Sequence, residues 1–245
     1  MSEYKKSIFI YDDQIGRVDY VDHMGSDLTV VNSARVSFGV QKPKLSARDV
    51  KLVKYLIKHK HTSTLEHCSI TFKFTVPLYI RSQHHRHRTW SYNEISRRYT
   101  DKDYRFYTPK EFRTQHKSNR QASNPDKMIN PPILSEAGYG LIPPSYPKAS
   151  QVYYEQCEKA LATYKDLISA GVCREQARGI LPQTTYTEYY GTVNLNNLLK
   201  FISLRIHDGA QWEIVQVARA CLEIARDIYP ISVSAYEECI NGGKI

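Results

Sequence analysis

The chain has 245 residues, with 34 Lys and Arg against 25 Asp and Glu, and so a formal net charge of +9. A hydrophobic fraction of 41% and a charged fraction of 24% are ordinary for a globular protein and exclude a wholly disordered chain. Eleven glycines and eleven prolines without a repeat exclude collagen-like and low-complexity sequence.

The first sixty residues predict two short strands followed by two helices. We expect the strands at residues 5–11 and 16–22 and the helices at residues 27–36 and 46–61. Ser46, with Asp49 three residues later, has the spacing of a capping box, which marks the start of the second helix.

The middle of the chain predicts one half-buried strand and then a helix. Apolar and polar residues alternate over residues 70–76, which is the pattern of a strand with one buried face. Pro77 suits the first position of a helix, which we expect to run to about Arg88. Residues 113–147 hold six prolines and two glycines and predict a surface excursion rather than a domain boundary.

The C-terminal third predicts helices only. Apolar residues recur at helical spacing, and glycine or proline marks the ends. The expected helices span residues 152–169, 174–181, 195–206 and 210–229, the last closed by Pro230.

The densest group of charged and aromatic side chains lies between Arg81 and Arg98, with five arginines and three histidines against one carboxylate, Glu94. A basic run is usually a solvated surface. However, all five cations are arginines, which bind phosphate bidentately, and Trp90, Tyr92 and Tyr99 are interleaved with them as candidate stacking surfaces. A phosphorylated small molecule and a single-stranded RNA are both plausible ligands of such a run.

The string Arg86-His87-Arg88, seven residues and then Ser96 resembles the signature of the flavin-dependent thymidylate synthases. Segments in the same order along nearly the whole chain also resemble that family. They are residues 34–38, 61, 66–67, 177–178, 181–182, 192–194, 204–205 and 210–213. The resemblance implies an α+β fold in which a small antiparallel sheet packs against several helices. It also implies one catalytic domain over residues 1–245.

The resemblance further implies a methyltransferase that converts dUMP to dTMP. Methylenetetrahydrofolate would supply the one-carbon unit, and NADPH would supply electrons through bound FAD. The family forms homotetramers with shared active sites, and nucleic acid is not an expected partner. The alternatives are an RNA-binding module and a flavoprotein reductase that no longer uses folate.

The resemblance assigns two sets of site residues. The expected dUMP-binding residues are Gln83, His84, His85, Arg86, Glu94, Ser96, Arg97, Arg98, Arg178 and Arg205. The expected FAD-binding residues are Ser63, Arg86, His87, Arg88, Glu94, Asn194, Asn196 and Lys200. Arg205 is the expected catalytic residue, because a guanidinium keeps its proton and stabilises charge that develops on the uracil ring. Asn196, Lys200 and Gly209 depart from the usual family residues, and Lys200 is a candidate replacement for a missing cation.

The cysteines and the apolar segments bear on the cellular compartment. Five scattered cysteines without a CxxC pair indicate neither a zinc site nor a disulfide framework, so no metal is expected. The most apolar segment, residues 70–80, is too short to span a bilayer and carries Lys73. Residues 1–14 lack the pattern of a secretory signal. We therefore expect a cytoplasmic protein with reduced thiols and no membrane partner.

Overall fold

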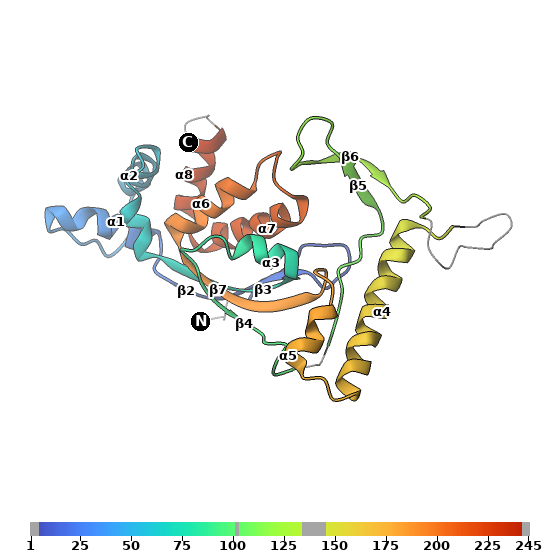
Figure 1. The fold of residues 1–245 in the computed structure, drawn as a ribbon. Helices are drawn as coiled ribbons and strands as arrows, with labels where there is room; N and C mark the ends of the chain where they lie inside the picture. Colours follow the sequence, from blue (N-terminus) through green and yellow to red (C-terminus); the bar gives the residue numbers. More distant parts are fainter. Residues whose placement is uncertain (1–4, 101–102, 134–145, 242–245) are drawn as a thin grey trace. The chain divides into compact units, whose positions relative to one another are not determined.

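The computed structural model describes residues 5–100, 103–133 and 146–241, and the chain divides into two compact units. The first unit comprises residues 1–75, 83–93 and 188–245, and the second comprises residues 76–82 and 94–187. Figure 1 shows the course of the chain from the blue N-terminal strands to the red C-terminal helix. The unit boundaries fall inside strands β3, β4 and β7 and helix α3, whose bounds are given below.

A five-stranded sheet runs in the order β1-β2-β3-β7-β4. Its strands are β1 (Ser7–Phe9), β2 (Arg17–Met24), β3 (Ser69–Pro77), β7 (Tyr186–Asn194) and β4 (Ser91–Glu94). The pairs β1–β2 and β2–β3 are antiparallel. On β3 the side chains of Ile70, Phe72 and Phe74 are fully buried, whereas those of Thr71 and Lys73 are partly exposed, as the sequence alternation predicts.

Among the described residues, five α-helices lie wholly within the first unit. They are α1 (Asp27–Arg35), α2 (Ala47–Lys58), α6 (Leu195–Arg205), α7 (Trp212–Ile228) and α8 (Pro230–Asn241). In Figure 1, α6, α7 and α8 lie on the same side of the sheet strands β2, β3 and β7. The predicted capping box of α2 is present, because the Ser46 N–H donates to Asp49 Oδ2 at 2.9 Å and the Asp49 N–H bonds back to Ser46.

The aromatic centre of the first unit lies where β3 meets β7. The rings of Phe74 and Tyr189 stack with centroids 5.0 Å apart, and Trp90 lies 6.0 Å from Phe74. A Cβ atom on Gly191 of β7 would approach Phe74 to 2.9 Å and Trp90 to 3.2 Å. Glycine at position 191 therefore leaves the room that these two rings occupy.

The second unit contains a hairpin and a long helix. Strands β5 (Phe112–Gln115) and β6 (Ser123–Ile129) pair antiparallel, and α4 spans Ala149–Ser169. The short helix α5 (Arg174–Ala177) continues as a 3-10 turn over Arg178–Ile180. Part of the predicted surface excursion thus forms the β5–β6 hairpin, and residues 134–145 of it lie outside the described residues.

Several elements differ from the sequence prediction, among them the unpredicted strand β4. Helix α3 (Leu78–His84) ends four residues before the predicted Arg88, because the backbone then makes tight turns in which the N–H of His87 bonds to the carbonyl of His84 at 2.9 Å. Strand β7 lies in a region that we expected to contain only helices. Helix α7 ends just before Pro230, as predicted, but Pro230 then begins the unpredicted helix α8, since proline fits the first turn of a helix.

The α+β class with a small antiparallel sheet and several helices is confirmed. Among the helices that the structure describes, none is long and apolar enough to cross a bilayer.

Candidate active site

The side chain of Arg205, the last residue of α6, contacts the end of α3 and the segment that follows it. Its Nε donates to Nε2 of His87 at 3.0 Å, and its Nη2 lies 3.5 Å from the carbonyl oxygen of Gln83. A ring nitrogen that accepts a hydrogen bond carries no proton, so His87 is neutral and protonated only on Nδ1. Burial, and then the charge of Arg205, lower the pKa of His87 to about 4.

Positive charge accumulates around this contact without a described counter-ion. Burial, together with the charge of Arg86, lowers the pKa of Arg205. None of Arg86, Arg88 and Arg205 forms an ion pair with a residue that the structure describes. Guanidinium groups held close together repel one another, and a bound anion or an electron-rich carbonyl relieves that repulsion.

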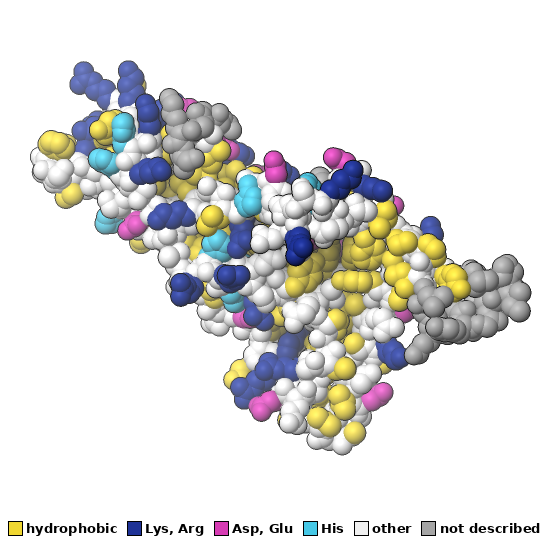
Figure 2. Space-filling model, turned by 45° about the horizontal axis from the view of Figure 1, so that its top comes forward, with side chains coloured by type: hydrophobic (Ala, Val, Ile, Leu, Met, Phe, Trp, Pro, Cys, Tyr) yellow, Lys and Arg dark blue, Asp and Glu magenta, His cyan; other side chains and the backbone are white. Residues whose placement is uncertain are grey.

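The face of the protein drawn in Figure 2 agrees with this charge balance. Lys and Arg side chains, in dark blue, are more frequent there than Asp and Glu side chains, in magenta. This surface favours anionic ligands.

His84 and Trp90 lie in the core of the first unit rather than at a surface. The side chain of His84 is fully buried, its Nδ1 lies 2.8 Å from the Tyr189 hydroxyl, and burial lowers its pKa well below the usual range. Trp90 is 5% exposed and packs edge-on against His84. Both side chains thus belong to the packed core of this unit, and a contact of His84 with a nucleotide stays a prediction.

His85 and Tyr92 pack against the segment that carries Arg86 and Arg88. Their rings stack with centroids 4.1 Å apart. The Tyr92 hydroxyl lies within hydrogen-bond distance of the carbonyl oxygens of His84 and His87, at 2.9 and 3.2 Å. These contacts fix the backbone on which Arg86 and Arg88 are carried.

In the second unit, Glu94 is held by two neighbours. Its Oε1 accepts from the Thr187 hydroxyl at 2.7 Å and lies 3.2 Å from Nε of Arg81. The carboxylate of this predicted ligand-binding residue is thus oriented by a strand residue and a helix residue of the same unit.

Ser96, Arg97 and Arg98 also lie in the second unit. The Ser96 hydroxyl accepts from the backbone N–H of Arg98 at 3.3 Å. Arg97 donates to the carbonyl of Tyr186 at 3.2 Å, so its guanidinium serves the fold. Arg98 pairs with Glu175 on α5 at 3.5 Å, and Arg178 follows three residues later on the exposed turn. The structure therefore brings Arg98 beside the turn that carries Arg178.

Two of the residues predicted for a cofactor, Asn196 and Lys200, line a cavity of the first unit. The cavity has a volume of about 470 Å³ and apolar walls that include Leu65, Leu199 and Tyr236. Lys60 and Lys200 both line it, and we call it the lysine cavity. Lys60 adopts a left-handed backbone conformation, with φ of 57°, which a non-glycine residue rarely takes.

Two of the predicted cofactor residues are engaged within the protein. Asn196 is 3% exposed, and its amide donates to Glu66 at 2.8 Å. Asn194 caps α6, because its Oδ1 accepts from the N–H of Asn197 at 2.9 Å. Ser63 lies on the short 3-10 helix Thr62–His67, whose first residue also lines the lysine cavity.

The sequence analysis missed three site neighbours: Lys60, Gln211 and Glu213. Gln211 and Glu213 belong to a segment that was noted only for its resemblance, and no side-chain role was assigned to it. A glutamine and a glutamate two positions apart at the start of a helix could have indicated these two polar side chains.

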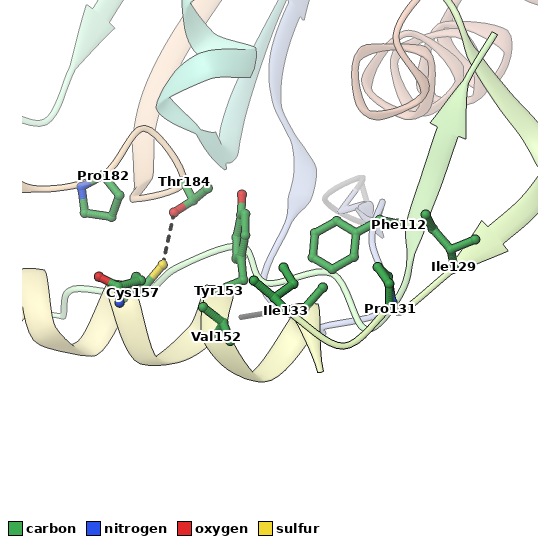
Figure 3. A pocket seen from close by; sticks show the side chains of 11 residues that line it. Phe112, Ile129, Pro131, Ile133, Val152, Tyr153, Cys157, Pro182 and Thr184 are labelled. Atoms are coloured by element: carbon green, nitrogen blue, oxygen red, sulfur yellow. Dashed lines mark hydrogen bonds between the residues drawn. The ribbon is translucent and has the colours of Figure 1, made fainter. Parts of the chain in front are cut away.

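The second unit holds another cavity, of about 490 Å³, shown in Figure 3. Its labelled walls are mainly apolar and include Phe112, Ile129 and Tyr153. Cys157 lies 3.5 Å from the Thr184 hydroxyl, as the dashed line marks. None of the described residues that line this cavity carries a charged side chain, so this lining does not suit a phosphorylated ligand.

Comparisons with known proteins identify the family of the chain. A family profile described as thymidylate synthase complementing protein matches residues 19–231. The flavin-dependent thymidylate synthase of Thermus thermophilus is 40% identical over 91% of this chain and 76% of its own length. That of Thermotoga neapolitana is 38% identical, with 90% of each chain covered.

The solved structures include a relative with the same fold. The UMP/dUMP methylase PolB of Streptomyces cacaoi, bound with 5-Br dUMP, superimposes with a TM-score of 0.74 and 29% identity. The match covers 90% of this chain and 94% of that one. These matches confirm the resemblance seen in the sequence, with its methyltransferase class and flavin cofactor. The chain belongs to the flavin-dependent thymidylate synthase family.

Proposed function

We propose that the protein methylates dUMP to dTMP, with methylenetetrahydrofolate as one-carbon donor and NADPH as reductant through bound FAD. The observation that carries this proposal is the contact between Arg205 and neutral His87 beside Arg86. It presents guanidinium donors, without a described acidic partner, on the segment that carries the family signature.

Arg205 is the proposed catalytic residue. A guanidinium has five N–H donors, and its contacts with His87 and Gln83 engage one on Nε and one on Nη2. The remaining donors are available to a carbonyl oxygen of the pyrimidine. Because arginine does not lose its proton, it stabilises negative charge that develops on the ring as carbon 5 becomes nucleophilic. Neutral His87 adds no second charge at this position.

Ser96, Arg98 and Arg178 are the proposed phosphate ligands. Arg98 and Arg178 are exposed. The ion pair between Arg98 and Glu175 lies at the surface, since both side chains are more than half exposed. A phosphate dianion competes well with such a pair, because charge-assisted bonds from arginine contribute about 1.5–3 kcal/mol each.

The lysine cavity fits the nucleotide part of FAD. Its apolar wall suits an aromatic ring, and its donor set of two ammonium groups with Thr62 and Ser203 suits phosphates and hydroxyls. Lys60 and Lys200 would hold the phosphates, while Ser63, Arg86, His87, Arg88, Glu94 and Asn194 remain the proposed contacts elsewhere on the cofactor. Asn196 would act through its surface in the cavity, since its amide is bonded to Glu66. Bound FAD supplies hydride transfer.

We further propose one catalytic domain that includes both units, because the run from Arg86 to Arg98 crosses the unit boundary. A homotetramer with shared sites is supported by the exposed apolar side chains of Val36 and Phe38, which are 74% and 81% accessible in the single chain. We place the enzyme in the cytoplasm, where its five free cysteines stay reduced.

The experiment that tests the function combines a spectrum with a tritium assay. Purified protein should be yellow, NADPH should bleach it without oxygen, and 5-tritiated dUMP should release tritium only when folate and reductant are both present. Colourless protein that binds RNA would favour an RNA-binding module, and bleaching without tritium release would favour a reductase.

UMP is a second candidate substrate, because PolB is described as a UMP/dUMP methylase. The same assay with tritiated UMP separates the two nucleotides. We expect dUMP to be preferred.

The shared-site proposal has its own test. Mixing Arg205→Ala subunits with Arg86→Ala subunits should restore activity if the two residues act in one site from different chains. No restoration at any mixing ratio would contradict shared sites.

A further inference from the structure

Three polar side chains of the first unit form a series that ends at the proposed nucleotide site. Nε2 of Gln211 donates to Oε2 of Glu213 at 3.0 Å. Oε1 of Gln211 in turn accepts a hydrogen bond from Nε2 of Gln83. The backbone carbonyl oxygen of Gln83 also lies beside the guanidinium group of Arg205.

The chemistry of these groups gives the series a direction. An ionised carboxylate only accepts hydrogen bonds, so the amide of Gln211 must turn its NH₂ toward Glu213 and its oxygen toward Gln83. Gln83 must then turn its own NH₂ toward Gln211. The oxygen of the Gln83 amide is left on the opposite side, and no described residue donates to it. Reversing either amide would place two acceptors or two donors face to face.

The position of Glu213 suits this role. Glu213 is 4% exposed and lies in the first turn of α7, where the helix dipole favours a negative charge. The Tyr11 hydroxyl donates to its backbone carbonyl at 3.2 Å, and the ring of Tyr11 contacts Trp212, with centroids 6.0 Å apart. The start of α7 is thus fixed by the core, and Gln211 immediately precedes the helix.

We propose that Glu213 is a positioning residue that sets the polarity of the Gln83 amide and thereby the choice of base. This inference rests on the proposed function. Gln83 presents a carbonyl acceptor, and the neighbouring Arg205 presents N–H donors. That combination matches the imide edge of uracil, which offers an N–H beside carbonyl oxygens. It opposes cytosine, which offers an unprotonated ring nitrogen beside an amino group.

The test compares binding of dUMP and dCMP to the holoenzyme carrying Glu213→Gln. This variant keeps the size of the side chain but gives it an NH₂ group, so both amides can reverse. The dissociation constants are measured by equilibrium dialysis with radiolabelled nucleotides. We expect dUMP to bind about tenfold more weakly and the preference for dUMP over dCMP to fall by a similar factor. Glu213→Asp, which can only accept, should restore most of the preference.

Matched variants separate positioning from general damage. Glu223→Gln lies on the same helix, in a surface pair with Lys6, and should leave both dissociation constants unchanged. Gln211→Ala breaks the series without altering the carboxylate, and it should lower the preference for dUMP over dCMP as Glu213→Gln does. This second variant keeps the test possible if the Glu213→Gln protein does not fold. In a Gln83→Ala background, Glu213→Gln should have no further effect.

Two results would overturn the inference. One is an unchanged preference in both Glu213→Gln and Gln211→Ala, while the wild-type protein binds dUMP normally. The other is that Glu213→Gln weakens the binding of dUMP and of dCMP equally and does so in the Gln83→Ala background as well. A wild-type holoenzyme that binds no dUMP would instead overturn the proposed function, and this inference with it.

Discussion

Nε of Arg205 donates a hydrogen bond to Nε2 of His87 over 3.0 Å, so the arginine holds the histidine in its neutral form. The pair joins the last turn of α6 to the signature segment. It explains why His87 does not add its charge to those of the neighbouring arginines near neutral pH.

The pair predicts a pH dependence of stability. Folding lowers the pKa of His87 from its ordinary 6.5 to about 4, so between these values the unfolded chain binds more protons than the folded one. The free energy of unfolding should therefore decrease as the pH falls from 6.5 toward 4. His84 contributes in the same direction, because burial lowers its pKa as well.

Denaturant unfolding of wild type and His87→Gln between pH 4.5 and 7.5 isolates the His87 part. Glutamine can still accept from Arg205 but does not titrate, so the variant should lose less stability on acidification. Parallel curves for the two proteins would contradict the assigned neutral state.

Arg205→Lys should reduce turnover at least about a hundredfold while binding of FAD changes little. Lysine keeps the charge but loses the planar set of donors that contacts His87 and Gln83 together. Tritium release from 5-tritiated dUMP measures turnover, and flavin absorbance measures occupancy. Arg219→Lys, an exposed arginine on α7, is the matched control and should behave as wild type.

Lys200→Ala should weaken FAD binding about tenfold and make it less sensitive to salt. One ammonium group of the lysine cavity is then missing, and a charge-assisted bond contributes roughly 1.5–3 kcal/mol. Fluorescence titration of the apoprotein with FAD gives the dissociation constant. Lys58→Ala, at the exposed end of α2, serves as the control, and an equal loss in both variants would argue against FAD phosphates in this cavity.

Asp49→Asn should lower the melting temperature without changing dUMP or FAD affinity. Hydrogen bonds from Lys42, Ser46 and Arg35 hold the pKa of Asp49 well below its usual range. This carboxylate therefore stabilises the fold above its unfolded pKa of about 3.9 and ceases to do so in acid. Differential scanning calorimetry at pH 7 measures the effect. Asp12→Asn, at an exposed position, should leave the melting temperature unchanged.

Local sequence patterns predicted the elements whose causes are themselves local. The alternation over residues 70–76 places β3, and the Ser46–Asp49 spacing places the start of α2. Strand β7 was not predicted, because Tyr186–Asn194 is flanked by helical segments and contains Gly191. The reason for this glycine is its close approach to Phe74 and Trp90, which only the structure shows. Pro230 correctly predicts the end of α7, but the sequence pattern does not show that the same proline also starts α8.

The site was predictable as a set of segments but not as a set of side-chain directions. Within the run from Arg81 to Arg98, no local pattern distinguishes a buried histidine such as His84 from one at a surface. That distinction arises from packing against Tyr189, more than a hundred residues away in the sequence. The series from Glu213 to Gln83 likewise depends on a contact between distant segments.

The chain has two tryptophans, and both lie in segments that matter for the site. Trp90 packs against His84 within the arginine-rich run, and Trp212 stands between Gln211 and Glu213. Tryptophan emission from the unlabelled protein, excited at wavelengths that tyrosine does not absorb, consequently originates in these two places. A change in the wavelength or intensity of this emission on addition of a nucleotide therefore reports on the segments around Trp90 and Trp212 rather than on the whole protein.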